Sequence, residues 1–326
     1  MINKLSVYVS NNVSPYHNLA VEQYLLEHVQ EGQCILYLWQ NQNTVVIGRN
    51  QNAFRECRVE LLQQEGGHLA RRLSGGGAVF HDLGNLNFTF LVPTKDYDLH
   101  RQQSVIAKAC MSFGIPVTIS GRNDILADGR KFSGNAFYHA GGRSYHHGTL
   151  MIGVDGERMK RYLSPSKEKL AAKSVESVRS RVVNLRELDP GLTCEDMKAA
   201  LSEAFGSVYG AEPEQLPEDY PDAGVVSALT KLNRSYEWLF GNRIPFTCSF
   251  YRHFDWGEAT LELVVQNGIV SEAKVYTDAI DWSIPARAEQ AVTGQRFVVP
   301  ELQRALRGAG LEPGITDDLC GMLEEV

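Results

Sequence analysis

The amino-acid sequence predicts an α+β protein in which a mixed or antiparallel sheet is flanked by helices. Helical and strand-like segments are interleaved along the 326 residues, without the regular strand–helix–strand order of a parallel sheet. Asp128-Gly129 and Gly141-Gly142 are typical of the tight turns that join antiparallel strands. After about Pro245 the chain changes to a compact unit of strands and a helix. We therefore expect two domains, residues 1–244 and a small α+β domain of residues 245–326.

The larger domain is expected to begin with a short strand-like run at 5–10, followed by a helix and further strands. Ser14-Pro15 combines an N-cap residue with a first-turn proline, and residues 19–28 carry apolar side chains at helical spacing. Within 86–90, apolar residues alternate with Asn87 and Thr89, which predicts a half-buried strand. The other segments that the same criteria identify are strands at 34–39, 44–48, 117–120, 130–139 and 145–154, and helices at 55–64 and 98–113.

The second half of the chain contains an irregular segment and then the smaller domain. Prolines and acidic residues accumulate over 211–224, which predicts an exposed loop, and residues 235–243 again favour a helix. The predicted elements of the smaller domain are strands at 259–266 and 269–278, joined by the turn Asn267-Gly268, and a helix at 300–308.

The overall composition excludes several classes of protein. A formal net charge of −7 argues against nucleic acid as a partner, although it leaves room for a local positive site. The six cysteines are scattered without a Cys-x-x-Cys pair, which favours reduced thiols in a cytoplasmic protein. The amino terminus lacks the apolar segment of a signal peptide, and the longest apolar run, Cys34–Trp39, is too short to cross a bilayer. No membrane association is therefore expected.

The segment 71–82, RRLSGGGAVFHD, is the first candidate site. Gly75, Gly76 and Gly77 remove every Cβ from a loop, so that backbone N–H groups can approach an anion closely. Arg71 and Arg72 add positive charge that suits phosphate or carboxylate groups. The segment matches neither the GxxxxGK[ST] phosphate loop nor the dinucleotide fingerprint. A flexible connector with exposed arginines is the alternative interpretation.

A second candidate site is the strand that contains Lys131. In a regular strand, Lys131 shares one face with Ser133 and Asn135, while Phe132 and Ala136 share the other. The polar face could present the Lys131 ammonium group to a ligand. The alternative is a solvated charge at the edge of a sheet.

Three residues nearby have roles that the sequence leaves open. Asp124 could hold a metal ion or cap a turn. His146 and His147 are adjacent, so they point to opposite faces of a strand and cannot both bind one metal ion without distortion. No cysteine or glutamate lies at ligand spacing, so zinc is not expected. One of the two histidines is expected to face the site.

Residues 173–184 form a further candidate element, because serines alternate there with basic residues. This composition suits a loop that is poorly ordered without ligand and closes over phosphates. The alternative is an ordinary basic surface loop.

Taken together, five segments resemble the lipoate–protein ligase A family: 71–85, 121–124, 131–136, 146–150 and 173–185. The resemblance implies a catalytic domain similar to those of biotin ligases and class II aminoacyl-tRNA synthetases, followed by a small carboxy-terminal domain. It implies that lipoate and ATP, with Mg²⁺, give lipoyl-AMP. The lipoyl group then passes to a lysine of a lipoyl domain, on the E2 subunits of 2-oxoacid dehydrogenases or on the glycine cleavage H protein.

The resemblance also implies roles for individual residues. Lys131 would be the catalytic residue, acting as an electrostatic clamp on both ATP and the acyl carboxylate. Asp124 stays a possible metal ligand. The other implied contacts are Arg72, Gly77, Ala78, Val79 and Phe80 for ATP, Ser74, Gly75, Gly76 and His81 for lipoate, and Asn123, Asp124, His147, Gly148 and Arg179 for the adenylate, with Val79, Phe80 and Ala136 lining the acyl chain.

Two alternative functions remain. The first is an octanoyl or lipoyl transferase of the same superfamily, which would need an activated cysteine. No cysteine lies between Cys110 and Cys194, the stretch that carries most of the motifs, which disfavours a transferase. The second is a non-catalytic homologue that binds lipoyl-AMP. Loss of Lys131 or Arg72 would have indicated such a homologue, and both residues are present.

Overall fold

The structure is a computed structural model that describes residues 2–120, 124–164, 182–241 and 244–325. The chain forms two compact units, each built from several segments. The larger unit comprises residues 1–46, 57–70 and 79–235, and the smaller unit comprises residues 47–56, 71–78 and 236–326. The glycine-rich segment thus belongs to the smaller unit together with the carboxy-terminal part. The functional domain limits of 1–244 and 245–326 stay a prediction.

The larger unit is built on an eight-stranded mixed sheet, which confirms the predicted fold class. The first three strands in its spatial order, β11, β1 and β2, are parallel to one another, and the remaining neighbours are antiparallel. In spatial order the strands are β11 (Glu214–Gln215), β1 (Lys4–Val9), β2 (Gln33–Trp39), β6 (Asn85–Pro93), β10 (Arg143–Met151), β9 (Arg130–Ala140), β8 (Asp124–Ala127) and β7 (Val117–Ser120).

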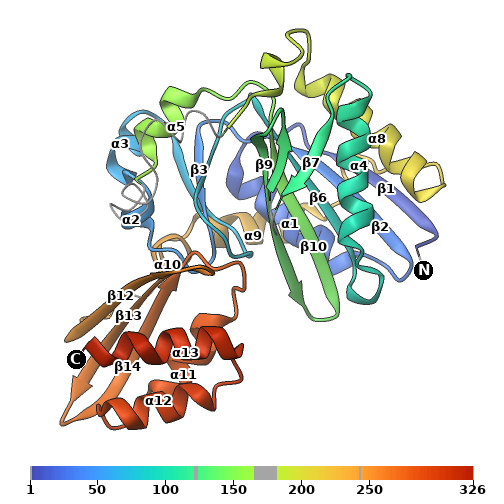
Figure 1. Cartoon of the computed structure of the whole chain (residues 1–326). Helices are drawn as coiled ribbons and strands as arrows, with labels where there is room; N and C mark the ends of the chain where they lie inside the picture. The colour runs from blue at the N-terminus through green and yellow to red at the C-terminus, as the bar shows by residue number, and fades with distance from the viewer. Residues whose placement is uncertain (1, 121–123, 165–181, 242–243, 326) are drawn as a thin grey trace. The chain divides into compact units, whose positions relative to one another are not determined.

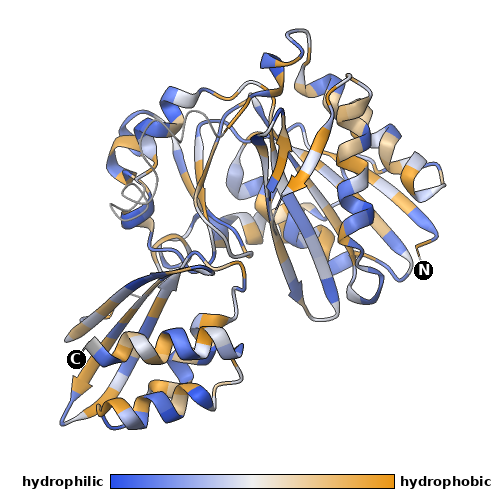
Figure 2. Cartoon of the chain, viewed as in Figure 1, coloured by the Kyte–Doolittle hydropathy of each residue, from blue (hydrophilic) through white to orange (hydrophobic). Residues whose placement is uncertain are grey.

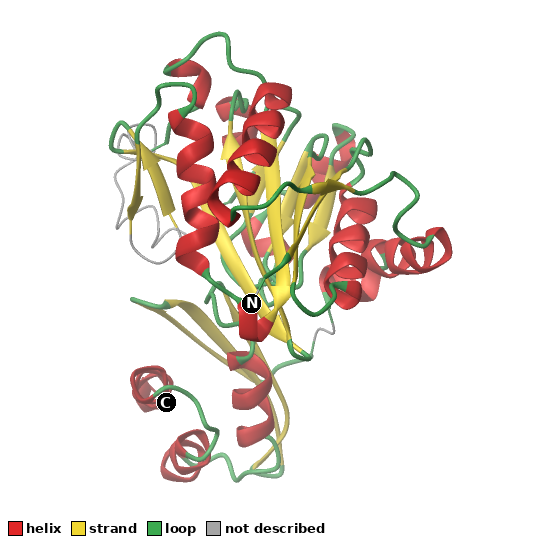
Figure 3. Cartoon of the chain, turned by 90° about the vertical axis from the view of Figure 1, so that its right-hand side faces the viewer, coloured by secondary structure: helices red, strands yellow, loops and turns green. Residues whose placement is uncertain are grey.

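Helices cover both faces of this sheet (Figures 1 and 3). Helix α1 (Pro15–His28) packs on β2, β6 and β10, and α9 (Ala223–Arg234) packs on α1. On the opposite face, α4 (Leu99–Met111) and α8 (Cys194–Tyr209) pack against each other over the main hydrophobic core. The side chains of β6 therefore alternate between two helical layers. All nine residues of β6 are buried, so the prediction of a half-buried strand is wrong, because α1 covers the polar face as well.

Local sequence signals explain where several elements start and turn. Asp98 accepts a hydrogen bond from the backbone of Arg101 and starts α4, and Thr193 forms a capping box at the start of α8. Asp128-Gly129, Gly141-Gly142 and Asn267-Gly268 all have φ between 51° and 75° at both residues. Two consecutive positive φ angles define the turn that joins twisted antiparallel strands, so all three predicted hairpins are confirmed.

The helix predicted over 55–64 is wrong as a single element. The chain instead forms α2 (Ala53–Glu56) and α3 (Val59–Gln64), separated by Cys57 and Arg58. Cys57 makes a bridge to Leu163, and the backbone N–H of Arg58 donates to the carbonyl of Tyr162, so a tertiary contact replaces the helical pattern at this point. A three-stranded sheet lies beside this region in the order β4 (His68–Arg71), β3 (Thr44–Ile47) and β5 (Val79–His81), and α5 (Gly156–Tyr162) contacts β5.

The carboxy-terminal part of the smaller unit is an antiparallel sheet of β12 (Cys248–Phe254), β13 (Gly257–Gln266) and β14 (Ile269–Thr277). The helix predicted at 300–308 is confirmed as α12 (Val299–Arg307), whereas α11 (Ile284–Val292) and α13 (Pro313–Met322) were not predicted. In Figure 2, hydrophobic and hydrophilic residues interleave along α12, and its Leu302 and Leu306 are buried in a second core. The short helix α10 (Tyr236–Phe240) also belongs to this unit.

Candidate functional site

Polar side chains line the face of the large sheet that α1 covers. The strand register aligns Trp39 with Asn87 and aligns Asn87 with Thr149, so these residues form one row across β2, β6 and β10. The register in the same way aligns Tyr37, Thr89 and His147 in the next row. All of these polar side chains except Thr149 are buried. The centre of this face is therefore an enclosed polar site within the larger unit.

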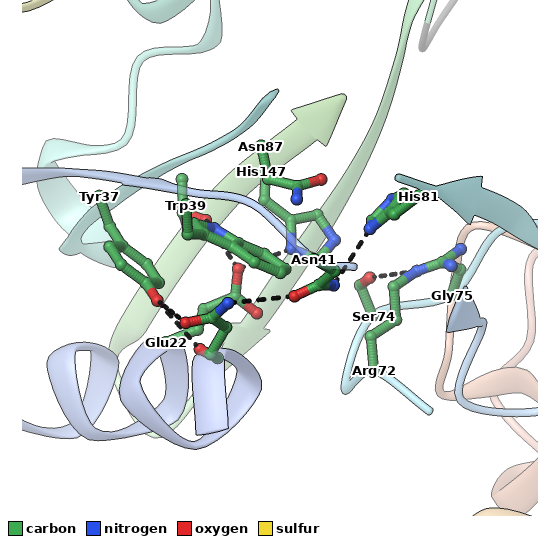
Figure 4. Close-up of polar contacts among 12 residues, drawn as sticks. Glu22, Tyr37, Trp39, Asn41, Arg72, Ser74, Gly75, His81, Asn87 and His147 are labelled. Atoms are coloured by element: carbon green, nitrogen blue, oxygen red, sulfur yellow. Dashed lines mark hydrogen bonds and ion pairs between the residues drawn. The ribbon is translucent and has the colours of Figure 1, made fainter. Parts of the chain in front are cut away.

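Glu22 of α1 organises this face through a chain of hydrogen bonds (Figure 4). One of its carboxylate oxygens, Oε1, accepts a hydrogen bond from Thr89 Oγ1 at 2.7 Å and lies 2.8 Å from His147 Nδ1. The indole N–H of Trp39 in turn donates to Thr89 Oγ1 at 3.2 Å. Since Glu22 is only 1% exposed, a carboxylate there requires these donors. Neither Glu22 nor Trp39 was predicted from the sequence.

The two adjacent histidines lie on opposite faces of the sheet and have different surroundings. His147 faces α1 and Glu22, whereas His146 is fully buried on the other face among Phe88, Phe90 and Phe137. His146 Nε2 lies 2.8 Å from Asn135 Oδ1, and its Nδ1 lies 3.2 Å from Gln102 Oε1. Burial lowers the pKa of His146 to about 3, so the ring is neutral. The structure therefore places His147, and not His146, on the polar face.

The buried His146 is expected to make the protein less stable in mild acid. In the unfolded chain a histidine binds its proton near pH 6.5, while folded His146 does so only near pH 3. The contribution of neutral His146 to the free energy of unfolding is fully present above pH ~6.5. It falls by up to ~1.4 kcal/mol per pH unit as the pH drops towards 3. Urea unfolding at pH 7, 6, 5 and 4 measures this loss. The His146→Gln variant should show a shallower pH dependence, and an identical dependence in both proteins would contradict the assignment.

Lys131 lies on a different face from the one that strict alternation predicts. A register shift in the β8–β9 pair pairs Ser133 with Ile125 but Lys131 with Leu126, so β9 contains a bulge. A Cβ built on Gly134 would meet the Cε and Nζ atoms of Lys131, both at 3.2 Å. The Lys131 side chain therefore lies over Gly134, on the same face as Thr149.

Ser133 and Asn135 remain on the opposite face, where Asn135 reaches His146. The prediction that Lys131 shares a face with them is therefore wrong, and the bulge is the reason. Phe132 is fully buried in the main core.

Asp124 positions the Lys131 ammonium group. Its Oδ1 atom lies 2.7 Å from Lys131 Nζ, across neighbouring strands, and both side chains are about one third exposed. The backbone of Lys131 also accepts a hydrogen bond from the N–H of Val183. The described end of the predicted loop 173–184 thus runs beside Lys131. Asn123, Arg179 and residues 173–181 lie outside the described residues.

The glycine-rich loop of the smaller unit is held by Arg72 and by residues 279–280. Arg72 donates through Nε to Ser74 Oγ at 3.1 Å (Figure 4). Its Nη2 donates to the carbonyls of Gly75 and Gly77, both at 2.8 Å. The N–H of Gly76, a residue with φ of 88°, donates to the carbonyl of Ala279. A Cβ on Gly75 would lie 2.3 Å and 2.4 Å from the carbonyl oxygens of Ala279 and Ile280. Glycine at 75 is thus required for backbone packing, while a Cβ at Gly77 would meet nothing within 4 Å.

Arg71 is buried, and its guanidinium group binds backbone carbonyls instead of facing a ligand. Its guanidinium group donates to the carbonyls of residues 48, 49, 51, 238 and 239. Burial lowers the pKa of Arg71 to about 10. Peptide carbonyls thus stabilise its positive charge.

The residues that follow the glycine loop pack within the larger unit. Phe80 is buried against the ring of Tyr162, with 5.6 Å between the ring centroids, while Ala78 and Val79 are partly exposed. His81 is buried, and its Nδ1 lies 3.2 Å from Asn41 Nδ2 (Figure 4).

Two further residues with predicted ligand contacts, Gly148 and Ala136, lie beside the histidines in the sheet. A Cβ on Gly148 would meet Phe88 and Asn135 within 2.8 Å, so this glycine is required for packing on the α4 side. Ala136 is buried and pairs with His147 across the β9–β10 ladder. The ligand contacts predicted for both residues, and for 78–81, stay predictions.

The comparisons with known proteins agree with this architecture. The family model described as the lipoyl protein ligase A/B catalytic domain matches residues 14–206, which is more than half of the chain. The chain belongs to the lipoate–protein ligase A family. A second model, the bacterial lipoate protein ligase C-terminus, matches residues 243–318.

Individual relatives give the same result. The lipoate-protein ligase A of Blochmanniella pennsylvanica is 40% identical over 286 residues, which cover 85% of this chain and 84% of the relative. Among solved structures, P. falciparum LipL1 in complex with lipoate superposes with a TM-score of 0.86 at 25% identity, over 98% of this chain and 99% of that one. A lipoate-protein ligase A bound with ATP shares the fold, with a TM-score of 0.62 at 21% identity, over 74% of this chain and 99% of that one.

Proposed function

We propose that this protein is an ATP-dependent lipoate–protein ligase, which activates lipoate as lipoyl-AMP and transfers the lipoyl group to a lysine of a carrier domain. Membership of the family supports this proposal, and the Lys131–Asp124 pair is the structural observation that carries it. Joining a carboxylate to an α-phosphate brings two anions together, so the site must supply fixed positive charge. Asp124 holds the ammonium group of Lys131 in one place before the substrates arrive.

Each of the two units contributes further residues to the proposed reaction. Residues 74–77 with Arg72 supply a rigid loop whose exposed Gly77 can approach a phosphate or carboxylate. On the larger unit, Trp39 provides an apolar surface for the acyl chain, while Glu22 and His147 fix its surroundings. Lys131 does not attack the acyl group. Its ammonium group stabilises charge that builds up during adenylation.

Mg²⁺ would accompany ATP in this reaction and stabilise negative charge on the phosphates. In the part of the chain that the structure describes, no group of three His, Cys, Asp or Glu side chains could hold a metal ion. A Mg²⁺ ion in this site would be bound mainly through the phosphate oxygens of ATP, and Asp124 is the carboxylate that could add to them.

The proposed acceptors are the lipoyl domains of 2-oxoacid dehydrogenase E2 subunits and the glycine cleavage H protein, by analogy with the family. We also propose a cytoplasmic location, because all six cysteines are free. None of the helices in the described ranges is long and apolar enough to span a bilayer.

Lipoate-dependent exchange of pyrophosphate into ATP tests the first half of the proposed reaction. Transfer to a purified lipoyl domain, followed by mass spectrometry, tests the second half. A protein that binds lipoyl-AMP but supports neither step would be the non-catalytic homologue instead.

The cysteines allow a test against the transferase alternative. Burial raises the pKa of Cys34, Cys57 and Cys110 to about 12 and that of Cys194 to about 11, and it also raises the pKa of the other two. A thioester-forming cysteine needs a lowered pKa. We therefore expect a variant with all six cysteines changed to Ala or Ser to keep most of its activity if it folds. Loss of activity that tracks one cysteine, with a thioester trapped on it, would favour the transferase.

A further inference from the structure

Asn87 carries a buried hydrogen-bond donor without a partner. The residue is 2% exposed, and among the described residues nothing accepts a hydrogen bond from its Nδ2 group. Its Oδ1 atom is already engaged, because Asn85 Nδ2 donates to it at 3.0 Å. The amide is thereby oriented with its NH₂ group directed away from Asn85. Leaving such a donor unpaired is unfavourable, and a ligand that accepts a hydrogen bond would recover this cost.

The position of Asn87 identifies the part of the ligand that it can reach. Asn87 stands on β6 beside Trp39 on one side and Thr149 on the other, and the N–H of Gly134 donates to Thr149 Oγ1. Asn87 and Gly134 are therefore two strands apart, about 10 Å. Lys131 Nζ lies over Gly134. A chain of about seven carbon–carbon bonds, each about 1.5 Å long, covers most of that distance. An acyl group whose carboxylate meets Lys131 can thus place its far end at Asn87 and Trp39.

The neighbours of Asn87 on this face are already hydrogen-bonded to one another. The indole N–H of Trp39 donates to the hydroxyl of Thr89, which donates to the carboxylate of Glu22. His147 contacts the same carboxylate through Nδ1. They need no hydrogen bond from the ligand. The Asn87 amide differs from them, because its orphan donor is satisfied only by a group that is not part of the described chain.

From these observations we infer that Asn87 is a specificity-determining residue, whose Nδ2 group donates a hydrogen bond to a dithiolane sulfur at the far end of the acyl chain. This inference rests on the proposed function. Lipoate carries sulfur at that end, and sulfur is a weak acceptor. Octanoate, the unsubstituted acid of the same length, carries only hydrogen and carbon there and leaves the amide unpaired. Asn87 therefore favours lipoate over octanoate.

The test is the ratio of kcat/KM for lipoate to kcat/KM for octanoate in pyrophosphate exchange. Asn87→Leu keeps the size of the side chain but removes both donors. We expect the ratio to fall about tenfold in this variant, through a lower value for lipoate and a higher one for octanoate. Asn87→Asp keeps acceptor oxygens and removes the donors. It should lose lipoate activity at least as strongly, which separates a donor role from an acceptor role.

The matched control is Gln102→Met. Gln102 is also a fully buried amide with an unpartnered Nε2 among the described residues, but it contacts His146 on the opposite face of the sheet. It should leave the ratio unchanged. Without substrates, Asn87→Leu should melt near the wild-type temperature, because it removes the orphan donor of Asn87 but also the acceptor of Asn85 Nδ2. Added lipoate should then raise its melting temperature less than that of the wild type.

The possible outcomes separate this inference from the proposed function. A wild type that exchanges pyrophosphate with neither acid contradicts the proposed function, and the inference falls with it. A wild type that uses lipoate, together with an Asn87→Leu variant whose ratio is unchanged, overturns the inference alone. Equal losses for both acids, or the same fall in ratio in Gln102→Met, would also overturn it, because they would show a purely structural effect.

Discussion

Replacing Lys131 with alanine is expected to lower lipoate-dependent pyrophosphate exchange by at least ~10²–10³-fold, the effect of removing one preorganised electrostatic group. The side chain lies over Gly134 and is fixed by Asp124 at 2.7 Å, so its charge needs little reorganisation when the substrates bind. Alanine leaves the two substrate anions without this charge. Exchange measured at saturating ATP and lipoate reports the effect on the adenylation step.

Two further variants sharpen the Lys131 experiment. Lys108→Ala removes an exposed lysine from α4 and should leave exchange unchanged. Asp124→Asn keeps Lys131 but loses the ionic contact that positions it, so we expect a smaller loss than in Lys131→Ala. Near-normal exchange in a folded Lys131→Ala protein would show that the lysine is not part of the adenylation site.

Replacing Gly75 with alanine is expected to lower activity by about 10²-fold, the scale for a displacement of about 1 Å in a catalytic site. The new methyl group would overlap the carbonyl oxygens of Ala279 and Ile280 at 2.3 Å and 2.4 Å. Both neighbours are backbone atoms, so no rotation of a side chain relieves the overlap. Either the loop or residues 279–280 must move, and the Gly76–Ala279 hydrogen bond is strained as a result. Thermal unfolding should show a loss of stability in the same variant.

Gly77→Ala provides the contrast within the same loop. Its methyl group meets no atom within 4 Å, so the variant should unfold at the wild-type temperature, and its KM for ATP then reports on the predicted nucleotide contact. If Gly75→Ala retains both the melting temperature and the activity of the wild type, the contact with residues 279–280 does not hold the loop in place.

The sequence predicted those parts of the fold that depend on local signals. The dipeptide turns at 128–129, 141–142 and 267–268 depend on positive φ angles that few residues tolerate, so the dipeptides alone identify the hairpins. The alternation of Asn87 and Thr89 with apolar residues likewise predicts one polar face of β6. Lys131 was assigned to the wrong face because of the bulge in β9. The bulge arises from the pairing of β9 with β8, which the sequence of β9 alone does not reveal.

The candidate site was predicted in part, because motif residues and supporting residues leave different signals. Lys131 and the glycine loop stand out by composition. Glu22 lies within an apolar helical face, and its role becomes visible only through its contact with His147, which is 125 positions away in the chain. Arg71 was expected to add charge for a ligand, but its five backbone acceptors come from residues 48–51 and 238–239. Contacts of such long range have no local pattern.

The way the two units share the polypeptide has a consequence for dividing the gene. The chain passes from one unit to the other at residues 46–47, 56–57, 70–71, 78–79 and 235–236, so the smaller unit cannot be excised as one continuous piece. A fragment that ends at residue 244 would keep the glycine loop but lack Ala279 and Ile280, on which Gly75 and Gly76 rest. An enzyme expressed as two polypeptides cut at this point would depend on their reassembly to shape the loop, and module exchange between relatives would have to carry residues 47–56 and 71–78 along with the carboxy-terminal part.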